Sequence, residues 1–443
     1  MQSNSPETLD CEDTDYVFVL GKNWKLSLAE LVSFFEARNI KLRFFNLSKS
    51  FSTANIEKSL NTSTVNELGG TLKIGKIVSQ VPTGIVKDAF LRGKKEAKLD
   101  LETSLPKGNT AGDLFLCQRK CVFGVSLYFD DSQFFRVYGN IHRFVGSHFK
   151  NELAAHGVRA RFMGFPRNRK LPQLTNVEVL KKRLVAESAE ILFCIGAEDS
   201  FLAKTVAAHD PFEFQKRDVG RPVQRKIFSI PPRLAKILVN LSMCQRGKVF
   251  LDPFCGVGTI LQEALLAGAC VIGVDVNPWC VEASRTNLDW LEDEYKLADA
   301  SCEVLQGDAC NLNQIHDNTV DCIATEPDLG PALRDVPTES YARRIVVKLK
   351  PLYSGFLSEA HRTLSEGGRL ALVSPYIRTH GKGFVAMDVE GMAKAVGFRS
   401  VSLFGRDYFS GSSPLIEELV GTSFFVDVMK RHKIGRKINV FTK

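Results

Sequence analysis

The feature that most constrains the fold is a glycine-rich turn between a predicted strand and a predicted helix. Val249–Leu251 is apolar, as a buried parallel strand is, Asp252–Gly258 forms a tight turn, and Thr259–Ala267 carries apolar residues at helical spacing. Gly256 and Gly258 allow the backbone to approach a ligand, and the following helix offers free N–H groups to a carboxylate or phosphate. The pattern predicts a cradle for a nucleotide-type cofactor.

Acidic residues follow at the ends of two further predicted strands. The apolar strand Cys270–Val274 ends in Asp275, which lies 19 residues (275 − 256) beyond Gly256. An acidic residue at about that distance binds the ribose diol in nucleotide-binding folds. A third predicted strand ends in Gln306-Gly-Asp-Ala309, which puts another acid, Asp308, at the end of a strand. An ordinary packing turn between strand and helix is the alternative, and it leaves these acids unexplained.

A glycine that dinucleotide-binding folds require is missing from the turn, because Leu261 stands three residues after Gly258. The run Asp252-Pro-Phe-Cys-Gly-Val-Gly-Thr259 instead resembles the first motif of class I methyltransferases that methylate exocyclic amino groups of nucleobases. The resemblance implies S-adenosyl-L-methionine as the cofactor. It implies contacts from the following residues: Asp252, Phe254, Gly256, Gly258, Thr259, Asp275, Val276, Asp308 and Ala309.

Positive charge is concentrated in three segments, although the formal net charge is only +8. Residues 142–183 hold ten Lys or Arg against two acids, 216–233 hold six against one, and 430–443 hold six with none. Such clusters are either solvated faces or a surface for a polyanion, and three of them favour nucleic acid. The predicted RNA-binding residues lie in the first segment: Arg143, Lys150, Arg159, Arg161, Arg167, Arg169, Lys170, Lys181, Lys182 and Arg183.

The remaining composition is that of a globular protein with two or three domains. The 11 cysteines include no C-x-x-C pair, and no His/Cys/Asp group has metal-ligand spacing, so we expect reduced thiols and no metal. No apolar run approaches the length of a membrane span, and the polar, acidic start is unlike a signal peptide. We therefore expect a cytoplasmic protein with no membrane association.

A second resemblance covers the amino-terminal half and the linker. The order of helix, Arg-rich strand, basic loop, helix and two apolar strands over about 140–208 resembles a THUMP domain, an RNA-binding module. Asp218-Val-Gly-Arg-Pro222, Ser229–Asn240 and Phe18-Val-Leu-Gly21 resemble segments of the archaeal and eukaryotic tRNA guanosine-methylating family that acts on position 10. The resemblance implies tRNA as a partner and, as in some eukaryotic relatives, a small activating protein subunit.

The predicted fold class is α/β. It combines a carboxyl-terminal Rossmann-like, seven-stranded class I methyltransferase fold with an amino-terminal α+β, THUMP-like RNA-binding half. Residues 98–112 are predicted to be a polar connector, and 398–404 and 423–429 are predicted to form the closing antiparallel strand pair. The predicted division is 1–98, a ferredoxin-like α+β module; 99–210, the THUMP-like domain; 211–240, a linker and leading helix; and 241–443, the methyltransferase domain.

The predicted catalytic corner follows the fourth strand of this sheet, at Glu326-Pro-Asp-Leu329. Amino-methylating relatives have Asp/Asn/Ser-Pro-Pro-aromatic here. In them the polar side chain and the first proline carbonyl accept the amino hydrogens, and the aromatic ring stacks on the base. The resemblance implies Glu326, Pro327 and Asp328 as catalytic residues. The aromatic ring is missing here, and the candidates to replace it are Phe254, Tyr341 and Tyr376.

These expectations combine into an S-adenosylmethionine-dependent RNA methyltransferase acting on the exocyclic amino group of a guanosine in tRNA. The altered corner leaves three hypotheses open. The chain is an active enzyme with a divergent pocket, an enzyme that methylates another atom or nucleic acid, or a non-catalytic tRNA-binding protein with a vestigial cofactor cleft.

Overall fold

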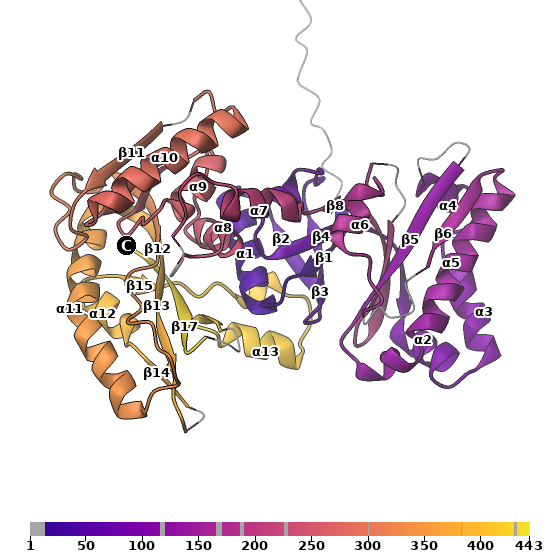
Figure 1. The fold of residues 1–443 in the computed structure, drawn as a ribbon. Coiled ribbons are helices and arrows are strands. Elements are labelled where there is room, and N and C mark those ends of the chain that lie inside the picture. The colour runs from indigo at the N-terminus through magenta and orange to yellow at the C-terminus, as the bar shows by residue number, and fades with distance from the viewer. Residues whose placement is uncertain are drawn as a thin grey trace, which may run out of the picture.

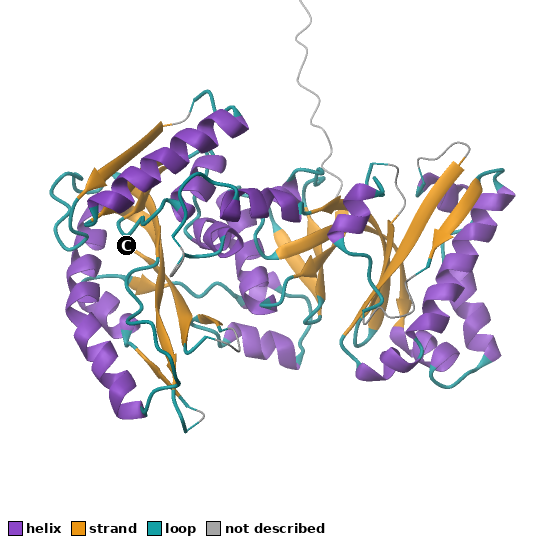
Figure 2. Cartoon of the chain, in the orientation of Figure 1, coloured by secondary structure: helices purple, strands orange, loops and turns teal. Residues whose placement is uncertain are grey.

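The structure is a computed structural model that describes residues 14–115, 120–164, 171–186, 190–225, 229–299, 301–381, 383–428 and 432–443. Its strands form two large sheets, one in each half of the chain (Figure 1). Helices cover the sheets in both halves, and further helices lie between the halves (Figure 2). Among the described residues, no helix combines the length and apolar character that a membrane span requires.

The amino-terminal sheet has the strand order β2-β3-β1-β4-β8-β7-β5-β6. Its strands are β1 (Thr14–Leu20), β2 (Leu42–Leu47), β3 (Phe51–Ile56), β4 (Thr71–Pro82), β5 (Lys120–Phe129), β6 (Arg159–Met163), β7 (Glu190–Ile195) and β8 (Asp199–Ala208). The helices of this half are α1 (Trp24–Ala37), η1 (Thr64–Glu67), α2 (Thr83–Phe90), α3 (Lys95–Ser104), α4 (Gly108–Asp113), η2 (Ser132–Arg136), α5 (Tyr138–Ala155) and α6 (Asn176–Lys181). Strands β4 and β8 pair from Lys73 to Pro82, so segments on either side of the predicted boundary at 98 share one sheet. The boundary itself stays a prediction.

The predicted connector at 98–112 is wrong, because α3 and α4 occupy most of it. Ala97 and Leu101 are the buried residues of α3, and they stand one helical turn apart. Two apolar residues at this spacing suffice to dock a helix whose other faces are polar. A helix with so few apolar residues cannot be distinguished from a polar loop by the sequence alone.

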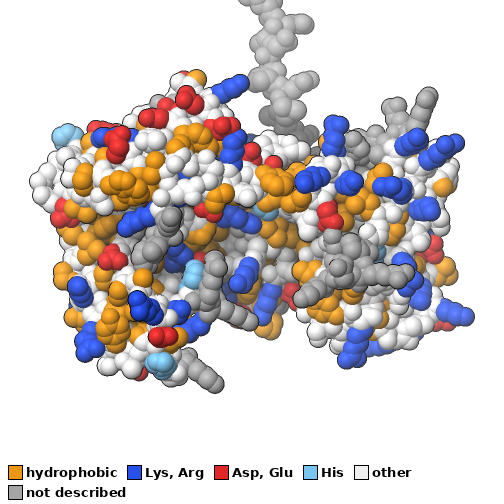
Figure 3. Space-filling view, in the orientation of Figure 1, with side chains coloured by type: hydrophobic (Ala, Val, Ile, Leu, Met, Phe, Trp, Pro, Cys, Tyr) orange, Lys and Arg blue, Asp and Glu red, His pale blue; other side chains and the backbone are white. Residues whose placement is uncertain are grey.

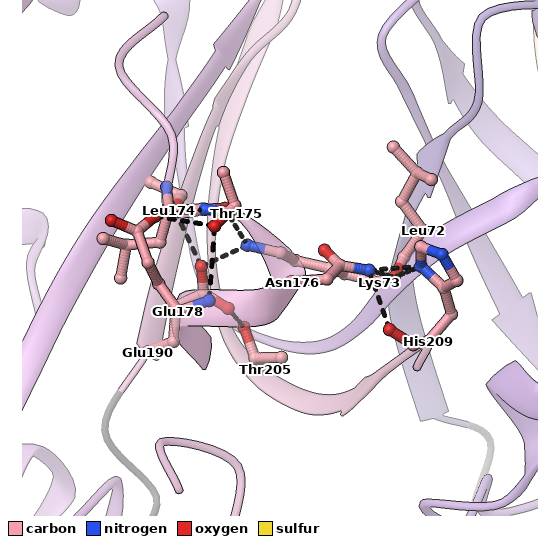
Figure 4. Close-up of polar contacts among 10 residues, drawn as sticks. Leu72, Lys73, Leu174, Thr175, Asn176, Glu178, Glu190, Thr205 and His209 are labelled. Atoms are coloured by element: carbon pink, nitrogen blue, oxygen red, sulfur yellow. Dashed lines mark hydrogen bonds and ion pairs between the residues drawn. The ribbon is translucent and has the colours of Figure 1, made fainter. Parts of the chain in front are cut away.

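A buried ion pair between Lys73 and Glu190 ties β4 to β7 (Figure 4). The Lys73 ammonium also donates to the Leu174 carbonyl at 2.9 Å. The hydroxyls of Ser126 and Thr205 donate to the Glu190 carboxylate at 2.7 and 2.9 Å. Because hydrogen bonds compensate both charges, the pair is tolerated in the core. It also fixes Leu174 just before α6.

The carboxyl-terminal sheet has the strand order β11-β10-β9-β12-β13-β17-β15, with β14 paired to β13 and β16 to β17. Its strands are β9 (Val249–Asp252), β10 (Cys270–Asp275), β11 (Ser301–Gln306), β12 (Val320–Thr325), β13 (Leu364–Arg378), β14 (Phe384–Ala386), β15 (Arg399–Ser400), β16 (Phe425–Asp427) and β17 (Ile434–Thr442). The helices are α7 (Pro211–Val219), α8 (Pro232–Leu241), α9 (Thr259–Leu266), α10 (Pro278–Tyr295), α11 (Glu339–Thr363), α12 (Val389–Ala395), η3 (Arg406–Tyr408) and α13 (Pro414–Val420). Strands β9 to β13 are parallel, and β17 is antiparallel to β13. The seven strands of the main path agree with the predicted α/β sheet.

The predicted closing strands at 398–404 and 423–429 are wrong in their extent and partner. Among the described residues of these two segments, only the short edge strands β15 and β16 form, and both pair with β17. Strand β17 is the antiparallel partner of β13, and it lies within the third basic cluster, 430–443. Charged residues alternating through this segment resemble a solvated tail in the sequence. In the fold, Arg436 and Lys437 are both 9% exposed, so this part of the cluster is not a free cationic surface.

Helix α1 packs against α8 and joins the two halves of the molecule. The buried Glu30 carboxylate accepts the backbone N–H groups of Gly69 and Gly70, both at 2.7 Å, and the Asn240 side-chain amide at 2.8 Å. Burial raises the pKa of Glu30 in spite of these hydrogen bonds. On α8, Arg233 Nε donates to the Gly69 carbonyl at 2.8 Å. The amino-terminal half therefore fixes the position of α8.

Replacing Glu30 with Ala should lower the free energy of unfolding by about 3 kcal/mol, because three donors lose their acceptor inside the core. Chemical denaturation of the full chain measures the change. Lys25→Ala, which removes a partly exposed ion pair with Glu418 and a cation–π contact with Trp24, is the control and should have a much smaller effect. Equal midpoints for Glu30→Ala and wild type would contradict the assigned role of this carboxylate.

Candidate functional site

A cavity of about 720 Å³ lies at the carboxyl ends of β9, β10 and β12. Ligands of open α/β sheets bind at this end, and the volume is in the range of roughly 300–1,000 Å³ that is usual for ligand pockets. The predicted residues that line it are Asp252, Phe254, Gly256, Thr259, Asp275, Glu326, Pro327 and Asp328. The two predicted groups, cofactor-binding and catalytic, thus meet in one cavity.

The glycine turn requires its glycines for two different reasons. Gly256 and Gly258 have φ angles of 55° and 83°, which side chains disfavour. A Cβ at Gly258 would meet Ser284 Oγ at 2.6 Å, so this glycine is needed for packing against α10. A Cβ at Gly256 would have no atom within 4 Å, because this residue faces the cavity. Gly256 is therefore the one at which a ligand can approach the backbone.

Asp275 is held in a fixed orientation at the cavity. Its Oδ2 accepts the Gly256 N–H at 2.9 Å, and its Oδ1 accepts the Asn277 N–H at 2.9 Å. Each oxygen keeps a lone pair for a further donor. The carboxylate is thus arranged to accept hydrogen bonds from a ligand in the cavity.

Asp252 is a buried carboxyl group in the cavity wall. Its Oδ1 accepts the Thr325 hydroxyl at 2.6 Å and the Phe254 N–H at 3.2 Å. Burial raises the pKa of Asp252 to about 7, and the carboxylates of Asp275 and Glu326 add to the rise. The group therefore changes its charge near neutral pH.

Four predicted cofactor contacts are not among the described residues that line the cavity: Gly258, Val276, Asp308 and Ala309. Gly258 is the N-cap of α9. Val276 is exposed just after β10, and Ala309 is buried. Asp308 Oδ1 accepts the Cys310 N–H at 2.9 Å, which closes a turn after β11. Their binding roles stay predictions, as do those of the lining residues.

The sequence did not reveal that Arg436 is part of the site. Its guanidinium forms a two-pronged ion pair with Glu326, with Nη2 3.1 Å from Oε1 and Nε bonded to Oε2. Both side chains are 11% exposed and line the cavity. Arg436 comes from β17, 110 residues from its partner, so no local pattern in the sequence indicates the pair.

Of the three aromatic candidates for base stacking, Phe254 lines the cavity. Its ring packs edge-on against Phe356, with the centroids 5.4 Å apart. Tyr341 is exposed on α11, and Tyr376 stacks on Phe384. Phe254 is therefore the candidate that the fold places beside the Glu326-Pro327 corner.

The predicted RNA-binding residues that the structure describes are exposed on α5, on β6 and at the end of α6. They are Arg143, Lys150, Arg159, Arg161, Lys181, Lys182 and Arg183. Arg167, Arg169 and Lys170 lie outside the described residues. Lys and Arg side chains are numerous over this half and around the middle of the face drawn in Figure 3. Their role in RNA binding stays a prediction. Within the described ranges, no group of three His, Cys, Asp or Glu residues is arranged to hold a metal ion.

Replacing Arg436 with Met should lower the free energy of unfolding by about 3 kcal/mol, because Glu326 would keep a nearly buried charge without its partner. The double variant Glu326→Gln with Arg436→Met removes both charges and should recover most of the loss. Denaturant titration of the two variants and wild type measures both effects. If Arg436→Met were as stable as the double variant, Arg436 would not be compensating the charge of Glu326.

Comparisons with known proteins identify a methyltransferase domain. Residues 221–382 match the family described as RMKL-like, methyltransferase domain. The tRNA (guanine(10)-N2)-dimethyltransferase of Methanothermobacter thermautotrophicus is 38% identical over 160 residues, which are 35% of this chain and 43% of that protein. The enzyme of the same name from Pyrococcus abyssi is 31% identical over 193 residues, 43% of this chain and 50% of that protein. The chain thus aligns with half or less of the length of these relatives.

A solved structure supports the fold over nearly the whole chain. The crystal structure of TrmN from Thermus thermophilus matches with a TM-score of 0.50 and 17% identity, covering 97% of this chain and 99% of that one. Together with the strand order, this match confirms the predicted Rossmann-like α/β class.

Proposed function

We propose that this chain, a member of the tRNA guanine-N2 methyltransferase family through its methyltransferase domain, methylates the exocyclic amino group of a guanosine in tRNA. The proposed methyl donor is S-adenosyl-L-methionine. The observation that carries the proposal is the single cavity that holds Gly256, Asp275 and the Glu326-Pro327 corner. The groups proposed to bind the donor and those proposed to bind the amino group line the same cavity, as methyl transfer between two bound molecules requires.

The residues around the glycine turn suit the proposed donor. Gly256 leaves its side of the cavity open, and Asp275 offers fixed acceptors to a ribose diol. The amino end of α9 offers N–H groups, because its N-cap Gly258 has no side chain to satisfy them. When bound, S-adenosyl-L-methionine supplies a methyl group activated by a sulfonium cation. The nearby carboxyl groups of Asp252 and Asp275 favour a cation by charge.

Glu326 acts by holding the amino group rather than by removing its proton. Arg436 donates to both Glu326 oxygens, which fixes the orientation of the carboxylate. Each oxygen keeps a lone pair that can accept an amino hydrogen of the base. With the Pro327 carbonyl as second acceptor, the nitrogen lone pair is turned away from the ring and toward the methyl group. Positioning and electrostatics then lower the barrier without a covalent intermediate.

The amino-terminal half is proposed to bind tRNA. Support comes from the exposed basic residues of α5, β6 and α6, since each phosphate contact adds salt-sensitive affinity without reading sequence. The THUMP-like identity of this half, the small activating subunit and the cytoplasmic location stay predictions.

The ion pair between Glu326 and Arg436 is also an observation in favour of the non-catalytic alternative. The Arg436 side chain lies against Glu326 in the cavity wall, where a bound base would also have to lie. A protein that no longer binds a base there would tolerate this arrangement. Calorimetry with S-adenosyl-L-methionine distinguishes the two functions. Retained tRNA binding without cofactor binding favours the alternative. Mass spectrometry of tRNA nucleosides from cells with and without the gene then identifies the product.

Glu326→Ala should reduce methyl transfer to tRNA by about 10²–10³-fold, because the amino group loses an oriented acceptor. Its affinity for the donor should stay close to that of wild type. Glu326→Gln is the matched variant. Its amide oxygen still accepts one hydrogen bond, so its loss should be smaller. Transfer of labelled methyl groups and calorimetry give the two readings, and full activity of Glu326→Ala would remove this residue from the mechanism.

Affinity for the donor should fall as the pH drops through about 7, the value to which burial raises the pKa of Asp252. Above that pH the group is an anion that attracts the cationic donor, and below it the group is neutral. Binding at pH 7 should therefore release protons, which calorimetry in buffers of different ionisation enthalpy detects. Asp252→Asn should bind more weakly at pH 8 and lose this dependence. An unchanged pH profile in that variant would assign the titration to another group.

A further inference from the structure

A basic segment that lies outside the three charge clusters of the sequence follows the Glu326-Pro327 corner. Residues 334–350 hold five Lys or Arg against two acids. Leu333 lines the cavity, and the next residue begins a set of four exposed side chains. The last three of them stand on α11 at positions i, i+3 and i+7, which share one side of a helix. We call the four residues the α11 strip: Arg334, Tyr341, Arg344 and Lys348.

The buried side of α11 packs against the loop that forms part of the cavity wall. A Cβ at Gly330 would meet Ile345 Cγ2 at 2.8 Å, and the Tyr353 hydroxyl donates to the Asp328 carbonyl at 3.1 Å. Gly330 and Asp328 both line the cavity. Figure 3 shows Lys and Arg side chains at the end of this domain where Figure 1 draws α11 and β14. The α11 strip is therefore held in a fixed position beside the cavity.

The cations of the α11 strip are not neutralised by the fold. Elsewhere on the same helix, Arg343 forms an ion pair with Glu339 at 2.6 Å. The three cations of the strip form no ion pair among the described residues. Arg344 and Lys348 also stand four residues apart, a spacing at which like charges destabilise a helix. Folding alone gives no reason to keep these two charges together.

The arrangement of the α11 strip suits a phosphate. The Arg344 guanidinium lies over the Tyr341 ring, with its central carbon 5.4 Å from the ring centroid. The N–H donors of a guanidinium lie in its plane and match the oxygens of a phosphate in pairs, so a ring against one face leaves them free. Lys348 adds a second cation one helical turn further along. The strip thus offers directed donors and charge to an anion in solvent.

The cavity beside the α11 strip would by itself repel a chain of phosphates. Carboxyl groups line it, and that of Asp328 is exposed. An enzyme that acts on a base takes the base out of the stack, which leaves the neighbouring phosphates at the mouth of the site. Those phosphates meet the acids of the wall unless cations lie close by. The α11 strip supplies such cations next to the acidic loop.

We propose that the α11 strip is a second RNA-contacting surface, which binds phosphates of the same RNA whose base enters the cavity. The inference rests on the proposed function, and it adds a surface on the methyltransferase domain to the one proposed for the amino-terminal half. Phosphate contacts fix the position of an RNA without reading its sequence. The strip therefore holds the backbone of the target nucleotide while the Glu326-Pro327 corner holds its amino group.

Replacing both Arg344 and Lys348 with Gln tests the surface. The affinity for tRNA should fall roughly tenfold near physiological salt. The slope of log affinity against log salt concentration should become less steep by about 1.4–1.8, because each lost phosphate contact contributes about 0.7–0.9. Equilibrium binding of tRNA to the full chain at several salt concentrations measures both. The KM for tRNA should rise while kcat and the affinity for the donor stay within about twofold of wild type.

The matched control is Arg246→Gln with Lys296→Gln. This double variant removes the same charge from two exposed residues at the opposite end of the sheet, since Arg246 precedes β9 and Lys296 is the C-cap of α10. Its tRNA affinity and salt slope should stay close to those of wild type. The α11 variant should melt no lower than wild type, because it loses two like charges one turn apart.

The outcomes distinguish the α11 strip from the proposed function. Wild-type protein that neither binds nor methylates tRNA overturns both. Wild-type activity with unchanged affinity and slope in the α11 variant overturns the strip alone, and so do equal losses in the α11 variant and the control, which would assign the effect to net charge. A loss confined to the α11 variant supports the strip.

Discussion

The structure depends on a hydrophobic core that runs from the amino-terminal sheet into the methyltransferase sheet. Phe18 and Leu31 belong to the same buried cluster as Leu238, Ile260 and Ala371, so α8 is packed between the two halves. Within this core the Glu30 carboxylate accepts hydrogen bonds from two backbone N–H groups and from the side-chain amide of Asn240 on α8, so these buried donors are satisfied. Because Pro231, the N-cap of α8, lines the cavity, the amino-terminal half fixes one wall of the site.

The cavity combines this rigid wall with an uneven distribution of charge. Carboxyl groups from β9, β10 and the end of β12 line one part of it, and the hydroxyls of Ser229 and Thr259, which accept hydrogen bonds from the buried Arg221, line another. Each charged group is held by neighbours before any ligand arrives. The proposed methyl transfer has no covalent intermediate and would depend on such preorganisation, because the protein would contribute mainly orientation and an electrostatic field.

Local chemistry in the sequence predicts much of this arrangement. The glycine turn and Asp275 are recognisable because 19 residues of strand, turn and helix fix their relation, and the fold brings both to the cavity. Arg436 and Arg221 are different. The role of each depends on its burial and on a distant partner: Glu326 is 110 residues from Arg436, and Thr259 is 38 residues from Arg221. A run of basic residues in the sequence indicates neither. Strand β17 was missed for the same reason, because its charges are neutralised only in the folded sheet.

The long separation between Glu326 and Arg436 has a consequence for how the molecule is made. During synthesis the corner after β12 leaves the ribosome well before β17, and the polypeptide must then close a loop of 110 residues before the two charges meet. Until that moment the Glu326 carboxylate has no Arg436 partner. The ordering of the Glu326-Pro327 corner by β17 is therefore a late event in folding. Incomplete chains that end before β17 would already contain the glycine turn but would lack the group that orients Glu326.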